Sequence, residues 1–234
     1  MIRLLLALAL FACSSSSKPA DEVKPRLDDD RASYEGRPIA GTCSYLGADW
    51  LERPERAVRE QPERVLDMLA IAKGATVADV GAGTGYFTVR LSKRVGANGN
   101  VLATELQPEM LRLLDTRLSR ERISNVRLIR GTEDRVMLPE RCCDLVLMVD
   151  VYHELADPPG VMAGVRRALK ETGRLVLVEY KGEDPKIPIK PEHKMTLAQI
   201  RKELEALGFA FVESREELPD QRVVIFVRDD APVR

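Results

Sequence analysis

The chain has 234 residues, 44% of them hydrophobic and 31% charged, so it is long enough for one α/β domain with a sizeable core and a short extension. Its formal net charge of -1, with basic and acidic residues interspersed, argues against a nucleic-acid surface built on phosphate neutralisation. The four cysteines include no C-x-x-C pair and no histidine spacing typical of zinc, so we expect neither a disulfide framework nor a metal site.

The N-terminal residues have the form of a signal peptide. A positively charged start at Arg3 precedes an apolar run from Leu4 to Phe11, which is far shorter than the roughly twenty residues that span a bilayer. A serine run and a polar stretch containing proline and aspartate follow. We therefore expect a signal peptide over residues 1–12, a flexible tether over residues 13–40 and a folded domain over residues 41–230.

Cys13, which closes the apolar run, resembles the cysteine of a bacterial lipobox, which carries lipid and becomes the mature N-terminus. This resemblance implies an exported protein that is lipid-anchored to a bacterial membrane, facing the periplasm, through Cys13 alone. A misassigned start codon is the alternative, and the protein would then be cytoplasmic. The sequence does not indicate an oligomeric state.

Strands and helices alternate through the rest of the chain. Two helical pieces begin at Pro54 and Pro62, where a missing N–H costs nothing, and Gly74 ends the second. The expected strands cover residues 76–80, 100–104, 126–130, 144–149, 174–179, 210–213 and 222–227. The expected helices between them cover residues 86–95, 108–118, 161–170 and 196–207, the last with a capping box formed by Thr196 and Gln199.

Each of the first five strands is a short, nearly continuous apolar run, which is typical of strands buried on both faces of a parallel sheet. Their alternation with helices predicts an α/β fold with a doubly wound sheet of seven strands. In such a sheet a ligand binds outside the carboxyl ends of the strands, near the first strand. Polar residues that end strands are therefore the candidates for a site.

The turn after the first strand carries the pattern Asp79-x-Gly81-x-Gly83-x-Gly85. Glycines let a ligand approach the backbone, and the helix that follows offers unpaired N–H groups. A dinucleotide turn would need glycine or alanine at position 86, where the pyrophosphate lies against the helix, but the chain has Tyr86. An acidic residue at the turn would repel a pyrophosphate and would attract an ammonium group.

This pattern resembles motif I of the class I S-adenosyl-L-methionine (SAM) dependent methyltransferases. Over about residues 50–228 the chain is similar to their small-molecule group, which includes methyltransferase type 11 and the ubiquinone/menaquinone-type methylases. The resemblance implies a Rossmann-like sheet that is mostly parallel, with an antiparallel C-terminal strand. It also implies SAM as the cofactor, whose ammonium, carboxylate, sulfonium and ribose suit an acidic turn.

The resemblance also implies roles for single residues at the cofactor. Asp79 would pair with the amino group, and Glu105, at the end of the second strand, would meet the ribose hydroxyls. Glu133 and Asp134 compete for a contact with the adenine. The cofactor-binding residues that we expect are Asp79, Gly81, Ala82, Gly83, Gly85, Tyr86, Glu105, Leu106, Thr132, Glu133 and Asp150.

Asp150 ends the fourth strand, where the family places a residue beside the sulfonium and the acceptor. His153 follows it and has a pKa suited to a general base, although a histidine in such a turn is as often a structural donor. Methyl transfer is an in-line displacement, so positioning matters more than acid–base chemistry. Asp150 and His153 are the candidate catalytic residues, and others could line an acceptor pocket: Tyr152, Glu154, Glu179, Tyr180 and Lys181.

Three functions stay open at this point. The first is a SAM-dependent methyltransferase with an unidentified small-molecule acceptor. The second is an NAD-dependent oxidoreductase, against which Tyr86 argues. The third is a non-catalytic lipoprotein that binds SAM or a nucleoside, which export would favour because SAM is made in the cytoplasm. Tyr45 and Trp50, ahead of the first helix, could form a lid over the site or pack on the sheet.

Overall fold

The computed structural model describes residues 32–231. The expected signal peptide, the lipid-carrying Cys13 and most of the tether therefore lie outside the described residues. Between residues 32 and 231, no helix combines the length and the apolar character that crossing a bilayer requires.

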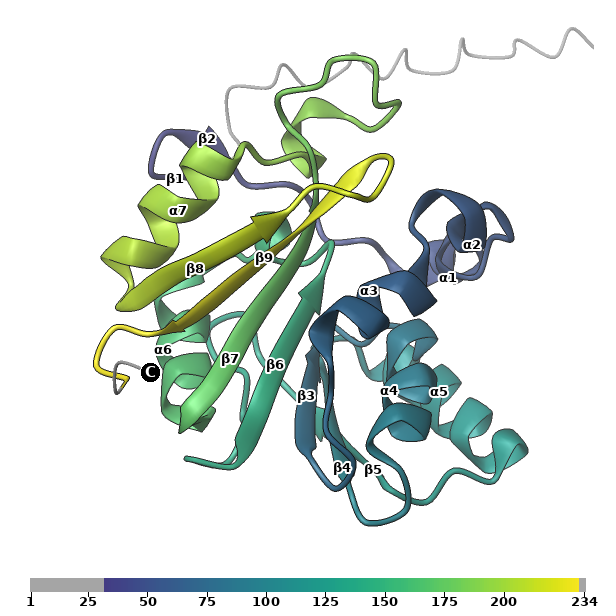
Figure 1. Ribbon diagram of the computed structural model, residues 1–234. Coiled ribbons are helices and arrows are strands. Elements are labelled where there is room, and N and C mark those ends of the chain that lie inside the picture. The colour runs from purple at the N-terminus through teal and green to yellow at the C-terminus, as the bar shows by residue number, and fades with distance from the viewer. Residues whose placement is uncertain (1–31, 232–234) are drawn as a thin grey trace, which may run out of the picture. The chain divides into compact units, whose positions relative to one another are not determined.

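A single seven-stranded sheet organises the domain (Figure 1), with the strands in the order β5-β4-β3-β6-β7-β9-β8. Neighbours from β5 to β7 pair in parallel, whereas β9 pairs antiparallel with both β7 and β8. This confirms the expected Rossmann-like sheet with its antiparallel C-terminal addition. The strands are β3 (Thr76–Val80), β4 (Asn100–Glu105), β5 (Val126–Arg130), β6 (Cys143–Val149), β7 (Leu169–Tyr180), β8 (Phe209–Arg215) and β9 (Gln221–Arg228).

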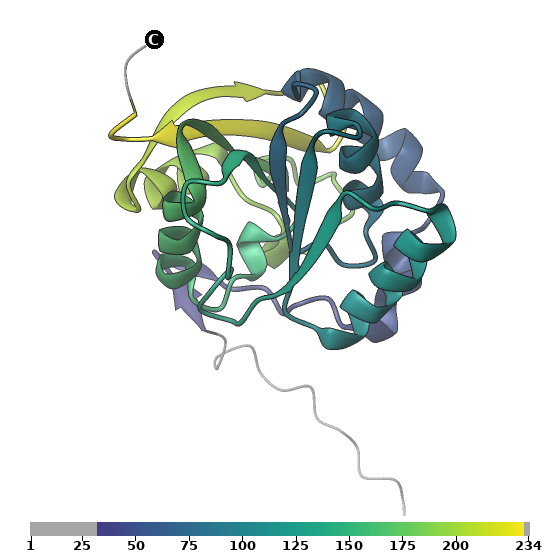
Figure 2. The same ribbon diagram turned by 90° about the horizontal axis from the view of Figure 1, so that it is seen from below.

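Helices cover both faces of the sheet (Figure 2). Alternate residues of each strand supply the two cores, as the pleat requires: Val77 packs with α3 and α4, and Ala78 packs with α6 and α7. A smaller cluster joins α4 and α5 around Ala103. The helices are α1 (Ala48–Leu51), α2 (Glu55–Arg59), α3 (Pro62–Leu69), α4 (Tyr86–Val95), α5 (Pro108–Glu121), α6 (Pro158–Ala168) and α7 (Leu197–Ala206), with 3₁₀ turns at η2 (Tyr45–Gly47), η3 (Tyr152–Glu154) and η4 (Pro191–His193).

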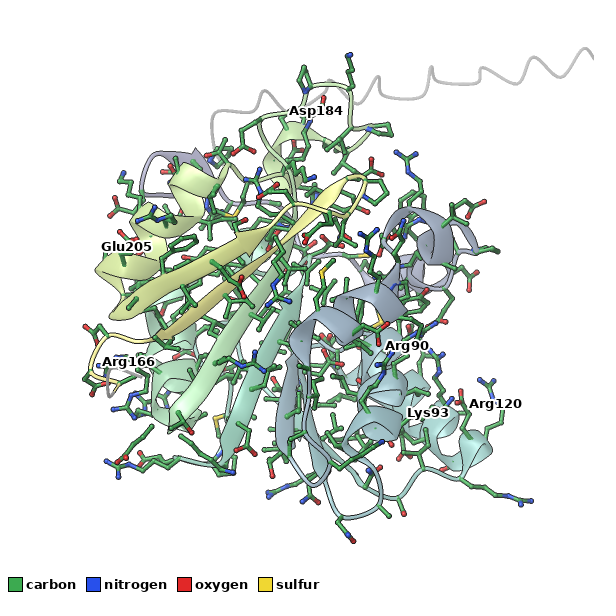
Figure 3. The ribbon with its side chains drawn as sticks, viewed as in Figure 1. Arg90, Lys93, Arg120, Arg166, Asp184 and Glu205 are labelled. Carbon is green, nitrogen blue, oxygen red and sulfur yellow. The ribbon has the colours of Figure 1, made fainter. Side chains whose placement is uncertain are left out.

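The outer faces of the helices carry charges of both signs. Figure 3 shows Lys93, Arg120 and Glu205 pointing away from the sheet, and all three are exposed. These positions are solvated helix faces, as the interspersed charges of the sequence predict.

Several expected bounds differ from the structure, and the differences at α6 and α7 have a visible cause. Helix α6 ends at Ala168 rather than at residue 170, because the buried Leu169 already takes an extended conformation and begins β7 beside Cys143. Thr196 does cap α7 by accepting a hydrogen bond from the Gln199 backbone N–H at 3.1 Å. The Gln199 side chain, however, donates to Glu203 instead of reaching back to Thr196, so only half of the capping box forms.

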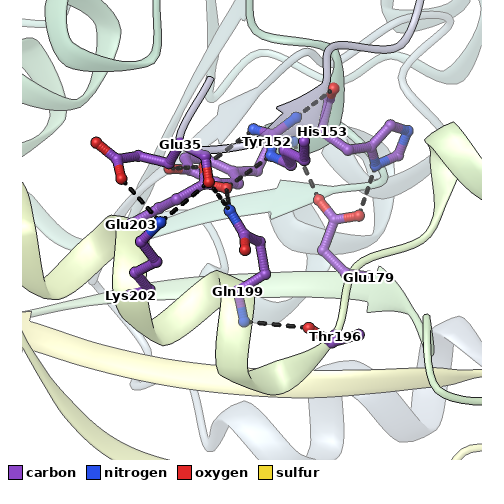
Figure 4. Close-up of polar contacts among 9 residues, drawn as sticks. Glu35, Tyr152, His153, Glu179, Thr196, Gln199, Lys202 and Glu203 are labelled. Atoms are coloured by element: carbon purple, nitrogen blue, oxygen red, sulfur yellow. Dashed lines mark hydrogen bonds and ion pairs between the residues drawn. The ribbon is translucent and has the colours of Figure 1, made fainter. Parts of the chain in front are cut away.

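The N-terminal boundary of the domain lies before residue 41. Strands β1 (Ser33–Tyr34) and β2 (Arg37–Pro38) form a short hairpin in the stretch expected to be tether. Arg37 of this hairpin donates to both carboxylate oxygens of Glu203 on α7, at 2.7 and 3.1 Å, and also to the carbonyl oxygen of His153. Figure 4 shows Glu203 and Tyr152 within this group of polar contacts. A fork-to-fork ion pair of this kind fixes the segment against the fold.

Glu203 offers a test of this packing. Its side chain is fully buried and also accepts a hydrogen bond from the Tyr152 hydroxyl at 2.9 Å. We expect Glu203→Ala to lower the free energy of unfolding by about 3–5 kcal/mol, because Arg37 would be left largely buried without its partner.

Urea unfolding followed by circular dichroism measures the change, and Glu205→Ala is the matched control on the same helix. Glu205 is exposed and pairs only with Arg201, so its loss should cost no more than about 0.5 kcal/mol. Equal losses for the two variants would contradict the structural role of the hairpin.

Candidate functional site

A cavity of about 560 Å³ opens at the carboxyl ends of the parallel strands, where a doubly wound sheet binds its ligands. Its size suits a nucleoside with an amino-acid tail and part of a second molecule. Eight of the expected site residues line it: Gly81, Gly83, Glu105, Leu106, Thr132, Glu133, Asp150 and His153. Of the two candidates for an adenine contact, Glu133 lines the cavity, whereas Asp134 accepts a hydrogen bond from Thr132 and does not line it.

The glycine turn brings backbone close to the cavity. Gly81 has a φ of 71°, and a Cβ on it would lie 2.4 Å from a methyl carbon of Val151, so no larger residue fits there. Gly85, with a φ of 87°, begins α4 and packs against Leu114 rather than facing the cavity. Gly81 and Gly83 thus expose their backbone to the cavity. Gly85 instead allows α4 to pack closely on α5.

Glu105 links the end of β4 to that turn. Its buried carboxylate accepts hydrogen bonds from the backbone N–H of Gly83 at 3.0 Å and from the N–H of Gln107 at 2.9 Å. Both oxygens are therefore held in place while the group still lines the cavity. The sequence pattern predicts the acid at this position but not its bond to the glycine turn.

Asp79 lies behind the turn. It lines a second, smaller cavity of about 50 Å³, together with Ala82 and Tyr86, instead of the large one. Its carboxylate is buried and accepts a hydrogen bond from the Thr88 hydroxyl at 2.5 Å. Burial raises the pKa of Asp79 to about 6, the Thr88 bond opposes the rise, and Glu105 adds to it.

Asp150 ends β6 in a left-handed conformation with a φ of 54°. Both of its carboxylate oxygens lie 2.8 Å from the side-chain amide nitrogen of Gln221, which donates from β9. Burial, together with the nearby carboxylates of Glu60 and Glu179, raises the pKa of Asp150. The strained backbone thus holds a carboxyl group in the cavity lining.

His153 is held on both sides of its ring. Its Nδ1 lies 2.6 Å from Glu179, and its Nε2 lies 3.1 Å from Nδ1 of His193. Burial would lower the pKa of His153, but the Glu179 carboxylate overcomes this and raises it to about 9. At neutral pH the ring is then protonated, which favours the structural role of His153 over that of a general base.

Several residues at the cavity were not singled out by the sequence. His193 comes from the loop before α7, and Arg53, Arg56 and Glu60 come from the segment around α2. Glu60 pairs with both arginines, the bond to Arg56 being 2.6 Å long. No local motif marks these residues, because their place at the site follows from tertiary packing.

The segment before the first long helix forms part of the cavity wall. Trp50 is 57% exposed and lines the cavity, with the Arg53 guanidinium stacked 3.9 Å from its ring centre. Tyr45 is also exposed but does not line the cavity. Of the two aromatic residues considered as a lid, Trp50 is the one in position for it.

Residues 78–177 match the family model described as a methyltransferase domain. This segment is similar to methyltransferase domains. The ubiquinone/menaquinone biosynthesis C-methyltransferase UbiE of Azotobacter vinelandii is 26% identical over 148 residues, or 63% of this chain and 54% of that protein. The demethylmenaquinone methyltransferase of Tropheryma whipplei is 32% identical over 133 residues, or 57% of this chain and 52% of that protein. The chain thus spans about half the length of the curated relatives it matches.

Solved structures agree with this similarity. A SAM dependent methyltransferase from Aquifex aeolicus is similar with a TM-score of 0.76 and 26% identity, over 80% of this chain and 100% of that one. A second, from Mesorhizobium loti, has a TM-score of 0.57 at 19% identity, over 71% of this chain and 98% of that one, and shares the fold. The family match and the Aquifex aeolicus structure indicate SAM as the cofactor.

The buried Asp79 carboxylate gives a pH-dependent prediction. Its folded pKa of about 6 exceeds the unfolded 3.8, so the folded state holds the proton more tightly, and stability falls as the pH rises between these values. Asp79→Asn removes this loss. We therefore compare the unfolding free energy of the variant with that of the parent protein at two pH values. The difference, variant minus parent, should be about 1–3 kcal/mol larger at about pH 7.5 than at about pH 4.

Denaturant unfolding of both proteins at the two pH values measures this difference. Because only the difference between parent and variant is used, the contribution of titrating groups far from Asp79 cancels. A difference that stays constant with pH would show that Asp79 does not carry a destabilised buried charge.

Proposed function

We propose that this protein is a SAM-dependent methyltransferase that acts on a small-molecule acceptor. The observation that carries the proposal is the shared cavity, in which the glycine turn and Glu105 lie at one part of the lining and Asp150 lies at another. One space can then hold a nucleoside cofactor and a second molecule together, which is what direct transfer between them requires.

The charge of the turn supports SAM over a dinucleotide. Asp79 and Glu105 place two buried carboxylates at the turn where a dinucleotide would bring its pyrophosphate. Tyr86 fills the start of α4, and its ring lies under the guanidinium groups of Arg56 and Arg90, at 4.1 and 3.9 Å. The Asp79 carboxylate behind this turn would attract an ammonium group, and Tyr86 occupies the position where a dinucleotide motif has glycine or alanine.

The residues present fit SAM, which when bound supplies a methyl group activated by its positive sulfur. Gly81 and Gly83 would expose backbone to the amino-acid end, Asp79 would act on the ammonium from behind the turn, and Glu105 would hold the ribose. Asp150 would lie beside the reacting centre. The task of the chain is to hold the acceptor in line with the methyl group and to exclude water.

The remaining cavity lining suits a largely apolar or aromatic acceptor. Trp50, Leu155 and Ile189 contribute apolar surface to it. The curated relatives are named for methylation in quinone biosynthesis, and we propose an acceptor of similar chemistry, a small aromatic ring compound. The N-terminal segment and several loops form this part of the cavity. Methyltransferases that share the cofactor motif can therefore accept different acceptors.

Cofactor binding tests the proposal directly. Isothermal titration of the purified chain should show micromolar binding of SAM and of S-adenosylhomocysteine and no binding of NAD. Glu105→Gln should weaken binding at least about tenfold, because it replaces the charge that accepts from Gly83 and faces the ribose. Glu109→Gln, a partly exposed change on α5, should leave the affinity unaltered.

Binding of NAD alone, or of none of the three ligands, would overturn the proposed activity. Binding of SAM without methyl transfer to any of a panel of phenols, hydroquinones and thiols would favour the non-catalytic alternative. The Glu109→Gln control separates a specific effect at Glu105 from a general loss of negative charge.

We also propose that the chain is exported and lipid-anchored through Cys13, on the strength of the N-terminal sequence. Radiolabelled palmitate supplied to expressing bacteria should enter the protein and should no longer do so in Cys13→Ala. Cys43→Ala serves as the control, since Cys43 lies in the folded domain. Equal labelling of the two variants, or no labelling of the parent, would favour a cytoplasmic protein.

A further inference from the structure

His153, Glu154 and His193 form a cluster of three side chains at the lining of the cavity. His153 and Glu154 lie on η3, directly after β6, and His193 lies on η4, before α7. The two histidines are 40 positions apart along the chain, so their spacing does not indicate a shared site. We propose that this cluster binds a divalent transition-metal ion of the zinc type.

The geometry of the three donor atoms fits such an ion. The His153 Nε2 atom lies 3.1 Å from Nδ1 of His193 and 3.9 Å from Oε1 of Glu154, and the latter two atoms are 3.6 Å apart. A point equidistant from all three lies about 2.1 Å from each, which is the usual bond length of Zn²⁺ to imidazole nitrogen and carboxylate oxygen. The three donor atoms are therefore already close enough together for one ion to bind them.

A second set of contacts orients two of the three ligands. The His153 Nδ1 atom donates to Glu179 at 2.6 Å, and Glu179 is itself held by the backbone N–H of Tyr152 at 3.1 Å. This arrangement keeps a proton on Nδ1 and turns Nε2 toward the cluster, as in the carboxylate–histidine–zinc units of metalloproteins. The backbone N–H of Cys43 donates to Oε2 of Glu154 and leaves Oε1 facing the imidazoles.

The ligand set and its charge suit a transition metal better than calcium or magnesium. Two imidazoles and one carboxylate are the protein ligands of many catalytic zinc sites, whereas the hard cations prefer oxygen alone. Glu154 and Glu179 bring two carboxylates to a largely buried place. A divalent cation between the imidazoles would offset this negative charge and replace the proton shared by the two rings.

A three-ligand site leaves coordination positions free, and all three ligands line the large cavity. An oxygen, nitrogen or sulfur atom of the acceptor could then bind the ion and be oriented by it. That use of the ion rests on the proposed methyl transfer, whereas the binding of the ion does not.

Metal binding to the untagged full-length chain tests the proposal. Added Zn²⁺ should bind with one ion per chain in isothermal titration, and Co²⁺ should give the visible absorption of a low-symmetry site with nitrogen and oxygen ligands. Glu154→Gln and His193→Asn should each weaken Zn²⁺ binding at least about tenfold, because each removes one of three ligands. Both positions are less deeply buried than His153, and melting curves will check that the variants fold.

Two controls make the result specific. Cys43→Ser keeps the backbone N–H that holds Glu154, and Glu109→Gln removes a carboxylate in the first turn of α5 that does not line the cavity, so both should bind Zn²⁺ as the parent does. Loss of binding in Cys43→Ser would overturn the three-ligand assignment. Absence of Zn²⁺ binding in the parent, or parent-like binding in both ligand variants, would show that the cluster is held by hydrogen bonds alone.

Titration of the same variants with S-adenosylhomocysteine keeps this proposal separate from the proposed activity. The ligand variants should retain parent-like affinity for that molecule, since none of their changed side chains belongs to the glycine turn or to Glu105. A chain that binds the cofactor product but no Zn²⁺ would refute the metal site alone.

Discussion

The hydrogen bond from the Gly83 backbone N–H to the buried Glu105 carboxylate is the contact on which the rest of the site depends. It joins the end of β4 to the turn that follows β3, so the ends of two neighbouring parallel strands are held together at the site. Because the carboxylate is charged and desolvated, its bonds to backbone N–H groups are of the stronger, charge-assisted kind. The glycine turn and the Glu105 carboxylate can therefore contact a ligand without rearranging.

Buried acids define the character of the cavity. Asp79, Glu105, Asp150 and Glu179 lie at or behind its lining, and burial raises the pKa of Asp79 and of Asp150. Each of these carboxylates accepts a hydrogen bond within the fold, but burying several negative charges together still costs free energy. A cationic nucleoside at the glycine turn and a divalent cation at the histidines would each offset part of this cost.

The sequence predicts best what is determined locally. Strands β3 and β5 begin and end where their apolar runs predict, and the glycine turn, Glu105 and Asp150 fall at strand ends as expected. These features follow from periodicity and from chain order in a parallel sheet. The same reasoning placed the start of the domain too late, since the hairpin at Arg37 is held by Glu203, a residue 166 positions away.

Side chains that meet only through the tertiary fold could not be predicted in this way. Gln221 reaches Asp150 from β9 and His193 reaches His153 from a loop, and neither contact has a local signature. His153 illustrates the consequence: its ordinary pKa suggests a base, but a carboxylate 26 positions away holds its proton. The chemistry of a site is set by such long-range partners more than by residue type.

A crystal structure of the protein with S-adenosylhomocysteine tests the central claim most directly. The account predicts the ribose hydroxyls at hydrogen-bond distance from Glu105, the amino-acid end over Gly81 and Gly83, and the sulfur facing Asp150. A ligand bound elsewhere, or a glycine turn closed off by neighbouring side chains, would contradict it.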